Sequence, residues 1–180
     1  MSETLQWGMA FPHRDSVQRA VDLLNVLLFD ADAASVSRVL QAHGESDVRL
    51  SPSDVAELRA AAVELRAVFA APDVASAASV LNALFAAYAR PPRLTDHEDG
   101  YGWHLHVDAA DDGPWGAWLV TSSALGLAAL LAERQDVPGG LCASPSCGRP
   151  FAHTGGGSPR RFCSPRCATR ERVAAHRARR

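Results

Sequence analysis

The chain of 180 residues is long enough for one compact domain with an appendage, or for two small domains. Apolar residues make up 47% and charged residues 21% at a net charge of −2, which allows a buried core and excludes a globally disordered chain. The charge is divided unevenly, because residues 1–141 contain 9 arginines and 19 acidic residues, whereas residues 142–180 contain 9 arginines, 1 acidic residue and all four cysteines. We therefore predict two parts, a mostly helical α+β domain over residues 1–137 and a cysteine-rich domain over residues 138–180.

Four helices are predicted before residue 91, from their apolar periods and from residues that favour helix ends. Asp15 or Ser16 is expected to cap the first helix, which runs to Phe29. Ser51-Pro52-Ser53-Asp54 is a strong helix start, with Ser51 as cap, Pro52 in the first turn and Asp54 completing a capping box. The other predicted spans are 33–42, ended near Gly44, 52–70, and a helix that Asp73 opens and Pro91-Pro92 ends.

Residues 93–96 and 101–107 are predicted to form a β-hairpin, since Asp99-Gly100 between them suits a tight turn. One face of the second strand would carry Trp103, Leu105 and Val107, and the other would carry His104 and His106. This small antiparallel pair is the β part of the expected α+β domain.

The stretch from Gly113 to Ala132 has no charged residue and is about as long as a membrane-spanning helix. Thr121, Ser122 and Ser123 lie at its middle, which favours a buried helix that runs to about Arg134. The start of the sequence lacks the basic flank and apolar run of a signal peptide, so we expect a cytoplasmic protein with no membrane partner. Pro138-Gly139-Gly140 is interpreted as a linker between the two parts.

The four cysteines are spaced Cys142-x4-Cys147-x15-Cys163-x3-Cys167. Two close pairs of thiolates are typical of one structural Zn²⁺ ion, whose four tetrahedral ligands leave no open position for an activated water. The alternatives are two disulfides or unrelated thiols. A short segment with few large apolar residues needs a metal to fold, however, and nothing places the chain in an oxidising compartment.

The surroundings of the cysteines predict a treble-clef finger. Turn-forming residues follow Cys142, and Gly155-Gly156-Gly157 is expected to reverse the chain between two short strands. Ser164-Pro165 suits the start of a helix, which places Cys163 just before that helix and Cys167 in its first turn.

The helix after Cys163 is rich in arginine. At 100° per residue, Arg166, Arg170 and Arg177 share one face, and Cys167, Ala174 and Ala178 mark the side expected to face inward. Arginine neutralises phosphates and reads guanine edges, so we predict that this helix binds duplex DNA. The predicted contacts are Arg160, Arg161, Arg166, Arg170 and Arg177.

Two other interpretations of this basic surface stay open. It is a solvated tail in one of them. In the other it is a protein-interaction module, docked on the acidic first part of the chain or on an acidic surface of a partner. An internally docked finger would lose folding stability when its arginines are replaced, whereas a DNA reader would lose affinity.

The chain resembles the bacterial CGNR zinc-finger proteins with an N-terminal ABATE domain, which are described as stress-induced transcription regulators. The likeness is strongest in segments 141–151, 160–167 and 174–180, and weaker in short segments such as Val21–Asn25 and Trp103–Val107. The resemblance implies an α/β first domain, suited to ligand sensing, and a DNA-binding treble clef. The naming motif Cys-Gly-Asn-Arg is here Cys167-Ala168-Thr169-Arg170, so its Cys and Arg are present and its Gly and Asn are not.

Two further groups in the first part are candidate sites. His97, His104 and His106 are candidates for a second metal or for an exposed polar strand face, and His104 is also a candidate ligand contact. Asp22 and Asn25 lie one turn apart on an apolar helix, where they form either a buried hydrogen-bond network or the lining of a small-molecule pocket.

No enzyme signature is found, so we expect a regulator rather than an enzyme. Its expected partners are duplex DNA and an unknown small-molecule effector, and a homodimer would suit a palindromic DNA site.

Overall fold

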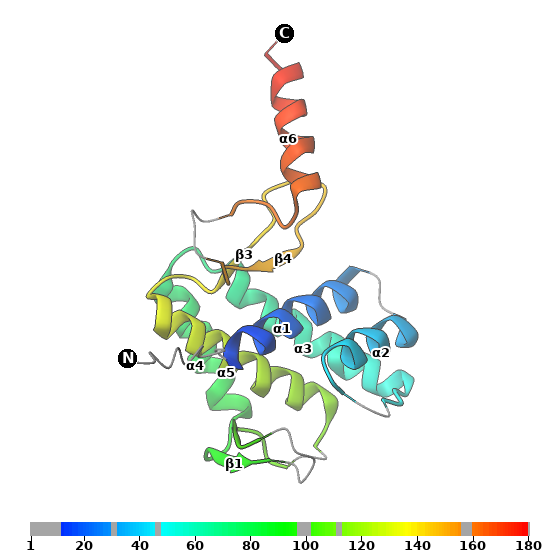
Figure 1. Cartoon of the computed structure of the whole chain (residues 1–180), viewed down its shortest axis with the longest axis vertical. Coiled ribbons are helices and arrows are strands. Elements are labelled where there is room, and N and C mark those ends of the chain that lie inside the picture. Colours follow the sequence, from blue (N-terminus) through cyan, green and yellow to red (C-terminus); the bar gives the residue numbers. More distant parts are fainter. Residues whose placement is uncertain are drawn as a thin grey trace, which may run out of the picture.

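A computed structural model describes residues 12–29, 32–45, 48–96, 102–110, 113–155 and 160–179, and within these ranges it contains six helices and two small hairpins. Figure 1 shows a helical bundle from which the C-terminal helix projects. The elements in chain order are α1 (Pro12–Phe29), α2 (Ala33–Ala42), α3 (Pro52–Ala70), α4 (Val74–Tyr88), β1 (Arg93–Thr95), β2 (His104–His106), α5 (Trp115–Arg134), β3 (Gly139–Leu141), β4 (Pro150–Ala152) and α6 (Pro165–Arg177). The predicted fold class, helical with small antiparallel hairpins, is confirmed.

The local end signals explain where the helices begin. Asp32, Ser51 and Asp73 accept hydrogen bonds from backbone N–H groups in the first turns of α2, α3 and α4, and Asp54 completes the capping box. These starts agree with the predictions. Helix α1 begins earlier than predicted, at Pro12, so the expected cap at Asp15 or Ser16 is wrong.

Helix α5 is the centre of the core, and it packs against α1, α3 and α4. Leu119, Leu127 and Leu130 are buried within this packing. At Gly126 a Cβ atom would collide with the hydroxyl of Ser16, so the glycine permits the close approach of α5 and α1. By length and composition α5 is also able to cross a membrane, but 50% of its apolar window lies inside the fold, which fits the predicted core helix.

The hairpin of β1 and β2 is antiparallel, with Leu94 opposite Leu105. Its apolar face is not covered by the described residues, since Leu94, Trp103 and Leu105 are all large and exposed, with Trp103 at 72%. The predicted Asp99-Gly100 turn lies outside the described residues.

The segment predicted as a linker is strand β3. It pairs with β4, with Gly140 opposite Phe151, and the hairpin packs on α1 and α3. A Cβ at Gly139 would lie 2.8 Å from Cδ1 of Phe69 on α3 and would also collide with the carbonyl oxygen of Phe151. Gly139 therefore serves close packing rather than flexibility, which is why the linker interpretation was wrong.

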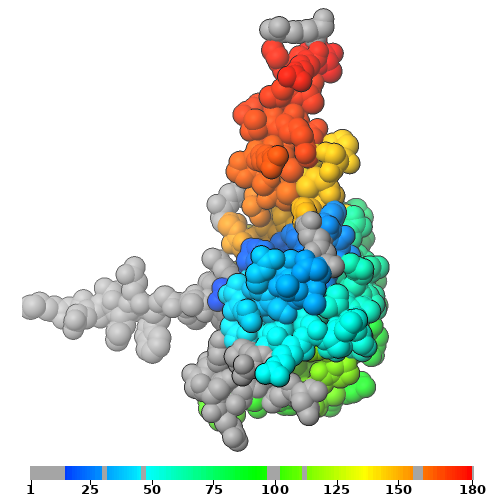
Figure 2. Space-filling model, turned by 90° about the vertical axis from the view of Figure 1, so that its right-hand side faces the viewer, coloured from blue at the N-terminus to red at the C-terminus, as the bar shows by residue number. Residues whose placement is uncertain are grey.

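Polar contacts hold the β3–β4 hairpin and its surroundings on the bundle. The side-chain amide of Asn25 donates to the carbonyl of Pro150 at 3.2 Å, and Arg149 donates to the carbonyl of Asn25 at 3.2 Å. Arg134, in the last turn of α5, donates to the carbonyls of Thr154 and Gly155. The base of the cysteine-rich part thus rests on α1 and α5, whereas α6 extends away from them (Figures 1 and 2). The domain boundary at residue 137 remains a prediction.

Candidate metal centre and basic helix

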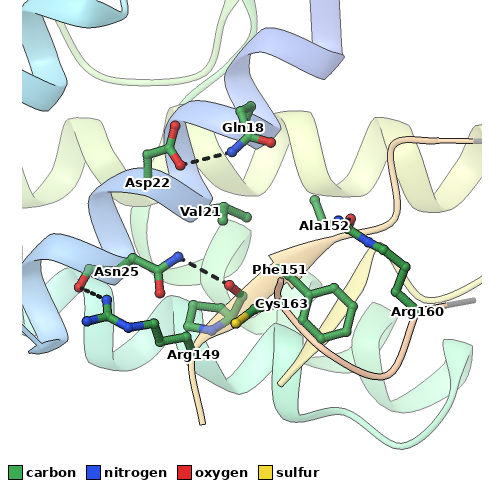
Figure 3. A pocket seen from close by; sticks show the side chains of 10 residues that line it. Gln18, Val21, Asp22, Asn25, Arg149, Phe151, Ala152, Arg160 and Cys163 are labelled. Carbon is green, nitrogen blue, oxygen red and sulfur yellow. Dashed lines mark hydrogen bonds between the residues drawn. The ribbon is translucent and has the colours of Figure 1, made fainter. Parts of the chain in front are cut away.

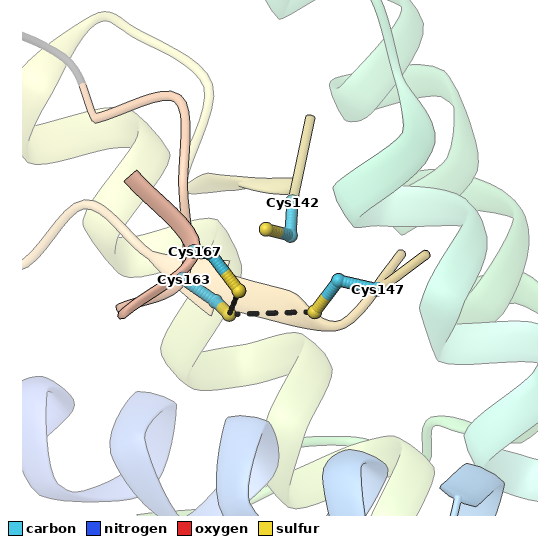
Figure 4. Close-up of side chains that lie close together, drawn as sticks. All are labelled: Cys142, Cys147, Cys163 and Cys167. Carbon is cyan, nitrogen blue, oxygen red and sulfur yellow. Dashed lines mark hydrogen bonds between the residues drawn. The ribbon is translucent and has the colours of Figure 1, made fainter. Parts of the chain in front are cut away.

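The four cysteines come together at the base of α6, between the hairpin and the helix (Figure 4). Cys142 directly follows β3, and Cys147 lies in the turn that leads to β4. Cys163 precedes α6, and Cys167 lies in its first turn, where Ser164 caps the helix by accepting from the backbone N–H of Cys167. Cys142 and Cys167 are buried, and the other two are partly exposed. The helix start predicted from Ser164-Pro165 thus places the second pair beside the first.

The geometry of the four sulfurs fits a tetrahedral metal. All four lie within 4.8 Å of one another, and Cys163 lies 3.6 Å from Cys147 and 3.8 Å from Cys167. A tetrahedron with Zn–S bonds of about 2.3 Å requires about 3.8 Å between sulfurs, whereas a disulfide requires about 2.05 Å. The cysteines are free, which contradicts the two-disulfide alternative.

The electrostatics of the four thiols also favour a bound cation. Burial raises the pKa of the Cys142 thiol, but hydrogen bonds from the backbone of Cys163 and Ser144, together with those from the thiols of Cys163 and Cys147, outweigh burial and lower it to about 7. Burial and contacts with the neighbouring thiols raise the pKa of Cys163 to about 12. Four sulfurs this close cannot all ionise without a compensating positive charge, which Zn²⁺ supplies. The predicted single structural zinc ion is therefore confirmed by the cluster and its donor set.

The guanidinium of Arg170 also forms contacts within the finger, although its side chain is 46% exposed. Its guanidinium donates to the hydroxyl of Ser144 at 2.6 Å and lies 3.6 Å from the sulfur of Cys167. Ser144 is 2% exposed, and its hydroxyl donates to the carboxylate of Glu171. Sequence reasoning missed Ser144 and Glu171, because the turn-rich pattern predicts a loop there but not its partner on the helix.

The other predicted DNA contacts are exposed. Arg160 donates to the carbonyl of Ala152 at 2.6 Å and lies over the ring of Phe151, so it helps to shape the hairpin. Arg161 lies near the ring of Phe162. The side chains of Arg166 and Arg177 form no hydrogen bond or ion pair with any other residue in the part of the chain that the structure describes.

The inward face predicted for α6 is only partly present. Cys167 is buried, but Ala174 and Ala178 are exposed, as is every side chain from Arg172 to Arg179. The prediction failed for the two alanines because α6 extends beyond the hairpin, so its last two turns have no surface of the bundle to pack on (Figure 2).

Asp22 and Asn25 line a pocket of about 340 Å³ between α1 and the hairpin (Figure 3). Its other lining residues include Arg149, Arg160 and Cys163. Asp22 accepts from Gln18 at 2.9 Å and pairs with His43 at 3.0 Å. Its side chain is 41% exposed, so these hydrogen bonds do not form the buried network of the first interpretation, whereas both residues do line a pocket. His104 is not part of this pocket, because it lies on β2, in the other hairpin.

His104 and His106 are neighbours on β2, with ring centroids 4.9 Å apart. His106 and Arg93 both contact the buried carboxylate of Asp108. His97 lies outside the described residues. Among those that are described, the four cysteines are the group positioned to hold a metal ion, and the second metal site is not supported.

A four-thiolate site that joins a turn to the first turn of a helix defines this C-terminal part as a zinc finger. Residues 140–180 match the family model of the CGNR zinc finger, in agreement with the predicted resemblance. No curated protein sequence matches the chain. The likeness of the first part to an ABATE domain, and the treble-clef topology, remain predictions. Of the two strands expected around Gly155-Gly156-Gly157, the one before the glycines is β4, which pairs with β3 across the cysteine turn, and the described residues 160–164 form no strand after them.

Proposed function

We propose that this protein is a cytoplasmic transcription regulator that binds duplex DNA through α6, with Zn²⁺ holding that helix in place. The observation that carries the proposal is the projecting, uncovered basic helix. Arg166, Arg172 and Arg177 are exposed on it, and α6 has no extended contact with the acidic bundle. A rigid, arginine-rich helix of this size fits a major groove and neutralises phosphates.

The helical bundle and the pocket at its junction with the finger support a sensing role in the same proposal. Asp22 and Asn25 line that pocket together with arginines of the finger. A small effector bound there would contact both parts of the chain at once. A homodimer that presents two basic helices would suit a palindromic site. An enzymatic role is not part of the proposal, because four thiolate ligands close the metal site to substrate.

The test is a salt titration of DNA binding by the zinc-loaded full chain, using mixed genomic duplex fragments. The double variant R166A/R177A is expected to weaken binding and to lower the salt slope by about 2, since each lost phosphate contact lowers it by about 1. The matched control is R49A, which removes an exposed arginine of the bundle and is expected to change neither quantity.

Two results would overturn the proposal. One is an absence of binding at low salt by protein shown to be folded and metal-loaded. The other is an equal loss of slope in R49A, which would show that the charge of the whole molecule, and not α6, governs the interaction. A protein that binds an acidic partner but no DNA would instead support the interaction-module alternative.

A further inference from the structure

Ser144 contacts both halves of the metal site, the first cysteine turn and helix α6. Its backbone hydrogen-bonds toward the sulfur of Cys142, and its carbonyl accepts from the backbone N–H of Cys147 at 2.9 Å. Its buried hydroxyl accepts from Arg170 and donates to Glu171, both of which belong to α6. One residue of the first cysteine turn therefore contacts both cysteines of that turn and two successive residues of the helix.

Helix α6 needs such a contact because little else holds its direction. Its 13 residues are too few for an isolated helix to be stable in water. The metal ligands hold only its N-terminal end, through Cys163 and Cys167. The side chains from Arg172 to Arg179 are exposed, and α6 has no extended contact with another helix or strand in the described part of the chain. A helix tied at one end alone would be free to change its angle to the hairpin.

We propose that Ser144, Arg170 and Glu171 form a polar clamp that fixes the direction of α6 relative to the first cysteine turn. Arg170 is then a positioning residue and not a DNA contact. The three groups satisfy one another, since the guanidinium and the carboxylate meet at the hydroxyl, and Arg170 Nε lies 3.5 Å from the carboxylate of Glu171. Charge-assisted hydrogen bonds of this kind are directional, so they restrain an angle as well as a distance.

The clamp divides the arginines of the finger into two classes. Arg170, and Arg160 through its bond to Ala152, shape the finger, whereas Arg166, Arg172 and Arg177 are left for a partner. That the second class of arginines contacts DNA rests on the proposed function. The direction of α6 does not depend on that function, so helix direction and DNA binding are measured separately.

The first experiment measures the direction of α6 in the zinc-loaded full chain by residual dipolar couplings of its backbone N–H groups. The wild-type couplings of α6 are expected to fit the same alignment as those of α1 to α5. E171A removes the acceptor of Ser144, whereas E171Q removes the same charge and keeps an acceptor oxygen. The couplings of α6 should shrink in E171A and in S144A, and should stay near the wild-type values in E171Q.

The metal site must be intact for this comparison, which the absorption spectrum of the cobalt-substituted protein reports. We expect the same four-thiolate spectrum in the wild type, E171A and E171Q. If S144A fails to bind metal, the α6 couplings of E171A and E171Q test the clamp without it. Unchanged α6 couplings in E171A would overturn the clamp.

The second experiment measures DNA binding of the same variants. Charge alone predicts that E171A and E171Q both bind more tightly and to the same extent. The clamp predicts that E171A binds about tenfold more weakly than E171Q, the equivalent of about one lost hydrogen bond. If the wild type binds no DNA, the proposed function fails, while the couplings still decide whether the clamp exists.

Discussion

Arginines that look alike in the sequence differ in the hydrogen-bond partners that they have in the structure. Arg170 binds Ser144, 26 positions earlier, and Arg149 binds the carbonyl of Asn25, 124 positions earlier. The cysteines could be assigned from the sequence because their spacing is local and their chemistry is specific. The helical wheel placed Arg170 correctly on the face of Arg166, but it says nothing about a partner that another segment supplies. Residue roles that depend on such distant partners therefore needed the structure.

Of the titratable groups, His106 offers a test at the scale of one residue. Its side chain is 16% exposed, and burial is the main cause that lowers its pKa, with Arg93 and His104 acting in the same direction. Asp108 opposes them, so D108N is expected to lower the pKa of His106 further. An NMR titration of the ring protons checks both statements, and a midpoint above the ordinary value of about 6.5 would contradict the first.

The same shift has a consequence for stability. The folded protein favours the neutral ring of His106, so its folded pKa lies below the unfolded value of about 6.5. Its contribution to stability is complete above that value and is lost as the pH falls from there through the folded pKa. H106Q should therefore remove part of the acid sensitivity of the free energy of unfolding, measured in denaturant with zinc in excess at each pH.

Elements with local start signals could be predicted closely, and elements that depend on packing could not. The caps at Asp32, Ser51 and Asp73 are visible in the sequence, because each lies within three residues of the N–H group that it binds. The sequence of β3 predicts a linker instead, because Gly-Gly next to Pro is the local pattern of a loop. The reason for Gly139 lies on α3, in the ring of Phe69, which no local pattern reveals.

The packing of β3 is tested by G139A. The added methyl group would press on the ring of Phe69 and on the backbone of β4, and overpacking of this kind costs about 1–3 kcal/mol. Thermal unfolding of the zinc-loaded protein should show the loss. G155A is the matched control, because a Cβ there meets nothing within 4 Å and the variant is expected to melt as the wild type does. Equal melting of the two variants would mean that β3 tolerates the extra volume.

On the scale of the whole molecule, the division of charge predicted the two parts, but not how they meet. The acidic bundle and the basic finger join through the hairpin, with Asn25, Arg149 and Arg134 making polar contacts to backbone carbonyls. The basic helix faces away from the bundle (Figure 1). Opposite net charges alone would have favoured docking of that helix on the bundle. The cysteine cluster and the Ser164 cap instead hold the N-terminal end of that helix beside the hairpin.

Removal of zinc tests this arrangement, because the two parts depend on different interactions. In the described chain the main buried core lies in α1 to α5. Among the fully buried residues of this core, Ala152 alone comes from the finger. Chelation should therefore unfold α6 and the cysteine turn and leave the bundle folded. In ¹H–¹⁵N spectra the amide signals of residues 160–179 should move to positions typical of an unfolded chain, while those of α3 and α5 keep their dispersion. DNA binding should disappear in parallel.

Two controls test whether loss of zinc is the cause of the unfolding of α6. Zn²⁺ added in excess of the chelator should restore the α6 signals, and Mg²⁺ should not, because thiolates bind hard cations poorly. C142S should resemble the chelated protein, since it removes a buried ligand while leaving α6 unchanged in sequence. If α6 stayed folded without metal, its stability would have to come from the Ser144 contacts. If the bundle unfolded together with α6, the hairpin would be an integral part of the core, and the two parts would form one cooperative unit.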